Sequence, residues 1–205
     1  PAPNPAAAKL DAAIKVVCWD DDITPEVAAD FQRKFGVTVE VQFVNSNEEV
    51  FDRLGKGEVW DVWTPSDYAA EAAAQKGLLA RLDPSHLPNL SRVDPRFRSA
   101  SYDPKHERSV PFYWRTTGLG YDKRVFPTPP ESWQAVFDPA RRAAYRGKIG
   151  LLDDMRETLG SALIALGYDP NSTREDELAK ARDLLVATKP ALAEVAGEGY
   201  EESLA

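Results

Sequence analysis

The chain has 205 residues, and 43% of them are hydrophobic, which is enough for one large domain or two small ones with ordinary cores. Because 33 acidic side chains outnumber 25 basic ones, the formal net charge is −8, which argues against nucleic acid or an anionic membrane as a partner and favours cations. The sequence has no run of the roughly 20 apolar residues that a membrane span needs. A single cysteine, Cys18, excludes an intramolecular disulfide, and its apolar surroundings predict a buried, inert thiol.

Strand and helix patterns alternate in the first half of the chain. Short apolar runs predict strands over residues 14–19, 37–44 and 59–63. Helices are expected over residues 25–35, 48–54 and 68–76. Asn47 and Ser66 are the expected N-caps of the second and third helices, and Gly36 and Gly77 are expected to end the first and third. A proline-studded stretch at residues 83–108 then predicts irregular surface structure.

The second half continues this alternation. Residues 110–114 and 118–121 are expected to be extended and to cross between two lobes. Further elements are a strand over residues 148–152 and helices over residues 133–144, 154–166 and 174–188. The pattern is typical of an α/β fold with a mostly parallel sheet covered on both faces. We therefore expect a flexible tether at residues 1–13, lobe one at residues 14–114, and a crossover with a partial lobe two at residues 115–205.

The two ends of the chain have unusual compositions. Residues 1–8, Pro-Ala-Pro-Asn-Pro-Ala-Ala-Ala, cannot pack, and they read either as the tether left by a removed secretory or lipid-anchor segment or as an arbitrary boundary. Residues 190–205 show no pattern of a closing strand or docking helix. We therefore expect the chain to stop within a larger fold, and to associate with a second polypeptide or with a copy of itself as a homodimer.

Two predicted strand-to-helix corners carry the polar side chains of a candidate ligand site. The first strand is followed by Trp19, Asp20 and Asp22, and the third by Ser66, Asp67 and Tyr68. Backbone N–H groups at a helix start lack partners, and open α/β sheets bind small molecules at the carboxyl ends of their strands. Since both corners combine aromatic rings with carboxylates, they predict a receptor for something small and cationic.

Several motifs, in order along residues 14–205, match one family. They include Val17-Cys18-Trp19-Asp20, Asn45-Ser46-Asn47-Glu48, Asp61-Val62-Trp63-Thr64-Pro65-Ser66-Asp67-Tyr68, Val110-Pro111-Phe112-Tyr113-Trp114 and Asp153-Asp154-Met155-Arg156-Glu157. With them the chain resembles the N-terminal portion of the spermidine/putrescine-binding proteins of bacterial ABC importers. The resemblance implies a class II periplasmic-binding-protein-like α/β fold with two lobes, here truncated. It also implies a periplasmic or extracellular protein that closes on a linear polyamine and delivers it to a membrane permease.

The resemblance also implies roles for individual residues. Trp19 would be an aromatic wall with Asp20 beside it. Ser66 and Tyr68 would line lobe one, with Asp67 next to them. Asp154 and Glu157 would be the carboxylates of lobe two, although without the resemblance the favoured interpretation is that they are favourable charges in the first turn of a helix. No cofactor, metal or enzymatic activity is implied.

Two positions depart from the family pattern. Asp22 stands where most relatives have an aromatic hydroxyl, and Arg115 stands where they have glycine. Asp22 adds negative charge near a bound amine. Arg115 would neutralise this negative charge by pairing with Asp20, Asp22 or Asp67, or would bind an anionic group on a ligand. The alternative ligand within the same receptor class is therefore a zwitterion such as an amino acid or an aminophosphonate.

A carboxylate-dependent hydrolase is the alternative from a different class. Two carboxylates on one helix and a serine at a strand-to-helix turn are groups that can do chemistry. However, Ser66 lies in Thr-Pro-Ser-Asp-Tyr rather than in Gly-x-Ser-x-Gly, and no histidine is placed as its base. His86 and His106 lack the spacing of metal ligands and are interpreted as exposed loop residues.

Overall fold

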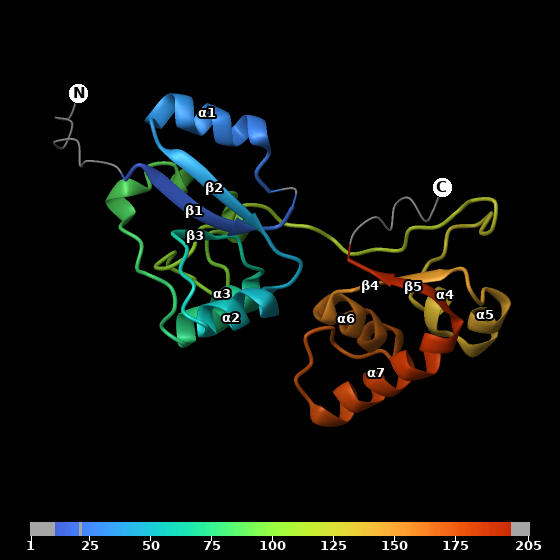
Figure 1. Ribbon diagram of the computed structural model, residues 1–205. Coiled ribbons are helices and arrows are strands. Elements are labelled where there is room, and N and C mark those ends of the chain that lie inside the picture. Colours follow the sequence, from blue (N-terminus) through green and yellow to red (C-terminus); the bar gives the residue numbers. More distant parts are fainter. Residues whose placement is uncertain (1–10, 21, 198–205) are drawn as a thin grey trace. The chain divides into compact units, whose positions relative to one another are not determined.

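A computed structural model describes residues 11–20 and 22–197. The chain divides into two compact units, Pro1–Trp114 and Arg115–Ala205, called unit 1 and unit 2 below (Figure 1). Most of the expected tether, the middle residue of the acidic turn Asp20-Asp21-Asp22, and the chain end at residues 198–205 lie outside the described residues. In the described part of the chain, no helix is both long and apolar enough to span a bilayer.

Unit 1 is built on a parallel sheet. Its strands are β1 (Ala13–Cys18), β2 (Thr38–Phe43) and β3 (Val62–Trp63), in the order β2-β1-β3. Strand β1 is central, and its last residues Val16, Val17 and Cys18 are buried, as expected for a strand with neighbours on both sides and covered faces. The predicted third strand is shorter than expected, because only two of its residues pair with β1 and Val59 is 75% exposed.

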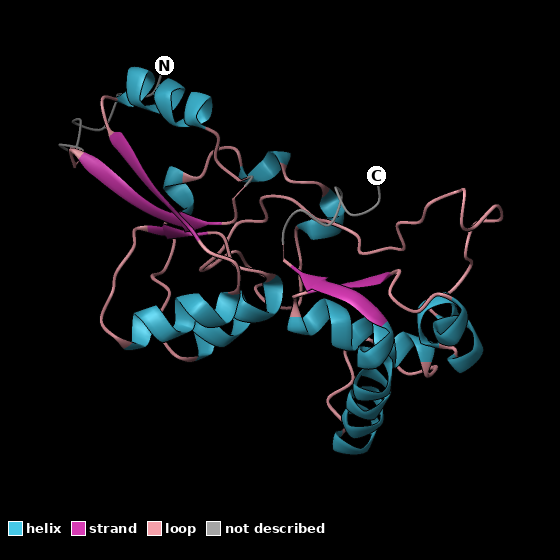
Figure 2. Ribbon diagram, turned by 45° about the vertical axis from the view of Figure 1, so that its right-hand side comes forward, coloured by secondary structure: helices cyan, strands magenta, loops and turns pink. Residues whose placement is uncertain are grey.

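Three helices cover the sheet of unit 1. They are α1 (Pro25–Phe35), α2 (Asn47–Gly55) and α3 (Asp67–Gln75), and in Figures 1 and 2 α1 lies on the opposite side of the sheet from α2 and α3. The core between the sheet and α2 centres on Val17, Val44 and Val50. Trp60 and Trp63 pack against this cluster. Along the chain, each of the three strands is followed by one of these helices, so the carboxyl end of each strand leads to the start of a helix.

The helix ends confirm some predicted caps and correct others. Gly36 ends α1 with φ 71°, a conformation in which a side chain would be strained. The N-cap of α2 is Ser46, whose hydroxyl accepts from the N–H of Glu49 at 3.1 Å, and not Asn47 as predicted. Ser66 occupies the N-cap position of α3, but its side chain makes no capping hydrogen bond. Both serines therefore sit at helix starts, but only Ser46 caps its helix through its hydroxyl.

The stretch between α3 and unit 2 is irregular, as predicted. It contains the short 3-10 turns Pro84–His86, Leu90–Arg92 and Pro95–Phe97. Residues 110–114 and 118–121 belong to neither of the sheets in the described part of the chain. His106 is buried, with φ 51°, so the prediction of an exposed loop histidine is wrong for it and holds only for His86. The loop around His106 is ordered by Asp103, whose carboxylate accepts from three backbone N–H groups, those of Glu107, Arg108 and Ser109.

Unit 2 contains a second parallel pair of strands, β4 (Ile149–Leu152) and β5 (Leu192–Ala196). The sequence patterns missed β5, because five residues of alternating exposure are a weak signal and the strand pairs with distant residues, such as Leu192 with Ile149. The predicted helix over residues 133–144 is two helices, α4 (Gln134–Phe137) and α5 (Pro139–Ala144). The chain breaks at Asp138 because proline at 139 cannot donate to α4 and instead begins α5.

The longer helices of unit 2 are α6 (Met155–Ala165) and α7 (Glu175–Thr188). The core beneath them gathers Phe137 from α4, Ile149 from β4, Leu163 from α6 and Ala181 from α7. Thr158 in α6 donates its hydroxyl hydrogen to the carbonyl of Leu152 at 2.6 Å. That bond ties the first turn of α6 to the end of β4, so the start of this helix is held at the carboxyl edge of the sheet.

Candidate functional site

The first predicted corner is held together by one carboxylate at the ends of β1 and β3. Asp22 Oδ2 accepts from the N–H of Trp19 at 3.3 Å and from the hydroxyl of Thr64 at 2.5 Å. Asp22 and Thr64 are 42 positions apart, so this bond links two strand ends that only the sheet brings together. The other oxygen, Oδ1, is buried and has no hydrogen-bond partner in the described part of the chain. Asp22 Oδ2 therefore holds the two strand ends together, while Oδ1 can still accept a hydrogen bond.

The second predicted corner is organised by a residue that the sequence analysis had treated as a cap. Asn47 is 1% exposed, and its side-chain nitrogen donates to the hydroxyl oxygens of Ser66 and Tyr68 at 3.1 and 3.0 Å. Its side-chain oxygen accepts from the N–H of Ser66 at 3.2 Å. The start of α2 therefore fixes the positions of two side chains at the start of α3.

Glu48 completes this corner. The Tyr68 hydroxyl donates to Glu48 Oε1 at 3.1 Å, and Glu48 is exposed at the surface. We name Asn47, Glu48, Ser66 and Tyr68 the α2–α3 polar cluster. Sequence reasoning missed Asn47 and Glu48 as functional candidates, although both lie in a motif that follows the second strand directly. The available signal was their place at a third strand-to-helix corner next to the other two.

The remaining candidates of unit 1 lie near these corners. Asp20 and Asp67 are exposed, and Asp67 accepts from the N–H of Tyr68 at 2.7 Å. Burial, and then the charges of Asp67 and Asp103, raise the pKa of Tyr102 above its ordinary value. Burial, followed by the charges of Asp22 and Asp20, raises the pKa of Cys18 to about 11, as expected for an inert thiol.

The two carboxylates of unit 2 come together on the first turn of α6. Asp154 is the N-cap of this helix, and its Oδ1 accepts from the N–H of Glu157 at 3.0 Å. Glu157 is exposed and lies in the first turn, where a negative charge is favourable. This geometry agrees with the interpretation that Asp154 caps the helix and that Glu157 is a favourable first-turn charge. It leaves Asp154 Oδ2 and the Glu157 carboxylate at the carboxyl edge of the β4–β5 pair.

Arg115 is the first residue of unit 2 and is exposed. The three aspartates with which it was expected to pair, Asp20, Asp22 and Asp67, belong to unit 1. An ion pair between Arg115 and any of them remains a prediction.

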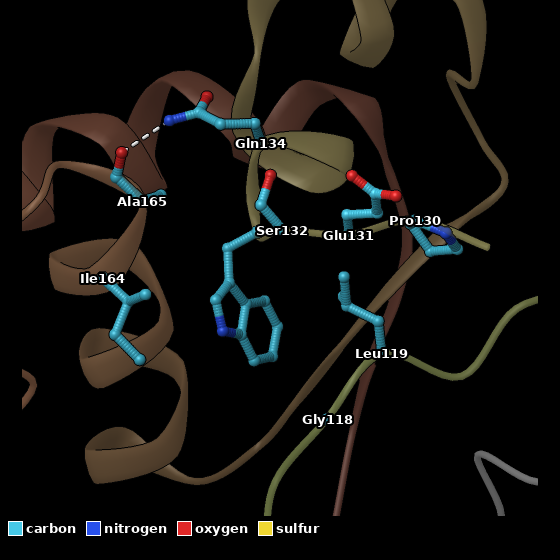
Figure 3. A pocket seen from close by; sticks show the side chains of 9 residues that line it. Gly118, Leu119, Pro130, Glu131, Ser132, Gln134, Ile164 and Ala165 are labelled. Atoms are coloured by element: carbon cyan, nitrogen blue, oxygen red, sulfur yellow. Dashed lines mark hydrogen bonds between the residues drawn. The ribbon is translucent and has the colours of Figure 1, made fainter.

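A hollow of about 390 Å³ in unit 2 is lined by none of the predicted ligand residues. Its walls come from the 118–119 segment, the start of α4 around Trp133, and the end of α6 (Figure 3). Gln134 reaches across it and donates to the carbonyl of Ala165 at 2.5 Å. Among the described residues, no three histidine, cysteine, aspartate or glutamate side chains are grouped so that they could hold a metal ion. The polar corners at the strand ends therefore remain the candidate site.

Comparison with known families identifies the class of protein. Residues 26–200 match the model of the bacterial extracellular solute-binding proteins, and the chain belongs to this family. The family is extracellular, which confirms the prediction of a periplasmic or extracellular protein.

Individual relatives within this family are similar to the chain over most of its length. A putrescine/cadaverine-binding protein of Pseudomonas aeruginosa is 31% identical over 97% of this chain and 58% of its own length. A putrescine-binding periplasmic protein of Escherichia coli is 32% identical over 84% of this chain and 50% of its own. The chain thus spans about half the length of the curated relatives that it matches.

Solved structures give the same result. A structure assigned to a spermidine/putrescine ABC transporter of Listeria monocytogenes is 34% identical, with a TM-score of 0.84 over 91% of this chain and 57% of that one. A lipoprotein of Treponema pallidum is 29% identical, with a TM-score of 0.81 over 93% of this chain and 60% of that one. The predicted periplasmic-binding-protein-like α/β fold and the predicted family resemblance are therefore confirmed.

Proposed function

We propose that the protein is an extracytoplasmic receptor that binds a linear diamine or polyamine and delivers it to the permease of an ABC importer. The observation that carries the proposal is the pair of interlinked polar corners in unit 1, where carboxylate oxygens and aromatic rings meet at the carboxyl ends of parallel strands. Relatives that are about one-third identical are named for putrescine, cadaverine and spermidine.

The chemistry of these groups suits an ammonium ion. An ammonium group that leaves water needs an opposite charge and hydrogen-bond acceptors, and it gains further from an aromatic face. The proposed ligand residues of unit 1 are Trp19, Asp20, Asp22, Ser66, Asp67 and Tyr68. Those of unit 2 are Asp154 and Glu157, with Arg115 as the residue that tunes the charge.

The proposal assigns no hydrolytic role to Ser66. The relatives are named as binding proteins. The Ser66 hydroxyl accepts from the amide of Asn47, and the chain's two histidines lie in the loops at residues 86 and 106. A serine nucleophile needs a general base on its hydroxyl, and an amide N–H cannot serve as one.

Association with a second polypeptide or a second copy is part of the proposal. Strand β2 lies at one edge of the sheet, with β1 as its neighbour in the described part of the chain, and Phe43 at its end is 48% exposed. An open edge and exposed apolar surface favour pairing with another chain.

The test is a ligand panel measured by thermal shift and calorimetry. Putrescine, cadaverine and spermidine should raise the unfolding midpoint increasingly as their concentration exceeds the dissociation constant, whereas butylamine, which matches putrescine but has one amine, should have little effect. Stabilisation by amino acids alone would favour the zwitterion receptor, and turnover of model esters would favour the hydrolase. Light scattering on the same samples measures association, and a monomer at all concentrations would contradict that part of the proposal.

A further inference from the structure

We propose that Glu48 is a further carboxylate with which unit 1 holds an ammonium group, and that Asn47 positions Tyr68 for this contact. The inference rests on the proposed function and goes further. The predicted ligand residues of the α2–α3 polar cluster, Ser66 and Tyr68, carry uncharged hydroxyl groups, whereas the inference adds a charged residue, Glu48, that was not predicted. It starts from the hydrogen bonds of Asn47.

The orientation of the Asn47 amide follows from its contact with Ser66. A backbone N–H can only donate, so the Asn47 atom 3.2 Å from the N–H of Ser66 must be the side-chain oxygen. The side-chain nitrogen then faces the hydroxyl oxygens of Ser66 and Tyr68 at 3.1 and 3.0 Å. Because Asn47 is 1% exposed, losing these bonds would leave buried polar atoms without partners, so the orientation is strongly held.

This orientation determines how the two hydroxyl groups are used. The amide nitrogen can only donate, so both hydroxyl oxygens accept from it. The hydroxyl hydrogen of Tyr68 is directed at Glu48 Oε1, at 3.1 Å. The phenol oxygen therefore already accepts one bond and donates another, which leaves it a poor acceptor for an ammonium group.

Glu48 has the accepting capacity that the phenol lacks. A carboxylate offers about four acceptor positions, and Tyr68 takes one of them. The neighbouring acidic residues of α2 are already in ion pairs: Glu49 with Arg53 at 3.4 Å and Asp52 with Lys56 at 2.5 Å. Among the ion pairs of the described residues, none involves Glu48, and it is exposed to a ligand. The negative charge of Glu48 is therefore held next to the ring of Tyr68 and remains available to a cation.

The inference assigns different tasks to neighbouring residues. Glu48 supplies charge and hydrogen-bond acceptors, Tyr68 supplies an aromatic face and holds Glu48 in place, and Asn47 acts through Tyr68 as a positioning residue. A ligand without a positive charge would gain no charge pairing from Glu48.

The experiment is calorimetry with putrescine on the wild-type protein, on Glu48→Gln and on the matched control Glu49→Gln. Glu48→Gln keeps an oxygen for the Tyr68 hydroxyl and removes the charge, so putrescine affinity should fall about tenfold, as expected for loss of a charged hydrogen bond. Glu49→Gln removes the same charge one residue away, from a carboxylate that Arg53 already pairs, and should change affinity less than about twofold. Without ligand, the unfolding midpoints of the wild type and of both variants should agree within experimental error, so that a change in affinity is not a change in stability.

A double-mutant cycle separates this role from a purely structural one. Tyr68→Phe keeps the ring and releases Glu48, so it should weaken putrescine binding in the wild type but have almost no further effect in Glu48→Gln. Wild-type protein that binds no amine would overturn the proposed function and this inference with it. Wild-type protein that binds putrescine while Glu48→Gln binds equally well would overturn the inference alone.

Discussion

The candidate residues of unit 1 bond to one another across long stretches of sequence, whereas the two candidate carboxylates of unit 2 lie on one helical turn, and the bond described between them joins residues of that turn. Asp22 reaches Thr64, and Asn47 reaches Ser66 and Tyr68, so three strand ends are linked through side chains. In unit 2, the Asp154 carboxylate accepts from the N–H of Glu157, three residues away. One unit carries a network and the other carries two carboxylates on one turn.

The difference teaches how the two units would contribute to binding. A network of buried polar groups fixes side-chain positions before a ligand arrives, and disrupting it costs stability. A helix cap such as Asp154 and an exposed first-turn carboxylate such as Glu157 contribute less to stability than a buried network does, and their charge is available to a cation. Variants in unit 2 should therefore affect mainly affinity, and variants in the network of unit 1 should affect stability as well.

The largest expected effect is on affinity, from the two carboxylates of unit 2. Asp154→Asn combined with Glu157→Gln should weaken spermidine or putrescine binding by about a hundredfold or more, since each change removes a charged contact. Asparagine is also a good N-cap, so α6 should keep its stability. Calorimetry measures the effect, and Glu175→Gln with Asp176→Asn removes two charges from the first turn of α7 as a control. Unchanged affinity in the first double variant would refute the assignment of these carboxylates.

An effect of intermediate size is expected on stability, from Asn47. Asn47→Ala leaves the N–H of Ser66 without its acceptor and should lower the free energy of unfolding by about 2 kcal/mol. Asp154→Ala removes a helix cap and should cost about 1 kcal/mol. Urea denaturation followed by tryptophan fluorescence compares the two, with the exposed Asn45→Ala as the control. A larger loss for Asp154→Ala than for Asn47→Ala would reverse the comparison between the units.

The smallest effect is expected for Arg115, an exposed cation at the start of unit 2. Arg115→Gly should leave polyamine affinity unchanged or improve it by no more than about threefold, because an exposed guanidinium opposes a cationic ligand only weakly when solvent screens it. Calorimetry with spermidine measures this, and Lys123→Gly removes another exposed cation as a control. A large loss of affinity, together with binding of an amino acid or aminophosphonate, would show that the ligand class is zwitterionic.

Elements with a strong local signal were predicted correctly. The helix over residues 25–35 and its end at Gly36 agree with α1, and the strand and helix predicted over 148–152 and 154–166 agree with β4 and α6 to within about a residue at each end. These segments have clear periodicity and clear stop signals. Strand β5 was missed and the 59–63 strand was overextended, because a strand is defined by pairing with distant residues that a local pattern does not contain.

The sequence by itself determined the α/β class, the family and the positions of the aromatic and acidic side chains at the strand ends, because these depend on residue type and local order. Only the tertiary structure decided which of those side chains bond to one another. Asn47 was expected to cap a helix, but packing turned it inward toward Ser66 and Tyr68, and Ser46 took over the cap. Parallel strands bring such residues together because their carboxyl ends meet at one edge of the sheet, however far apart they lie along the chain.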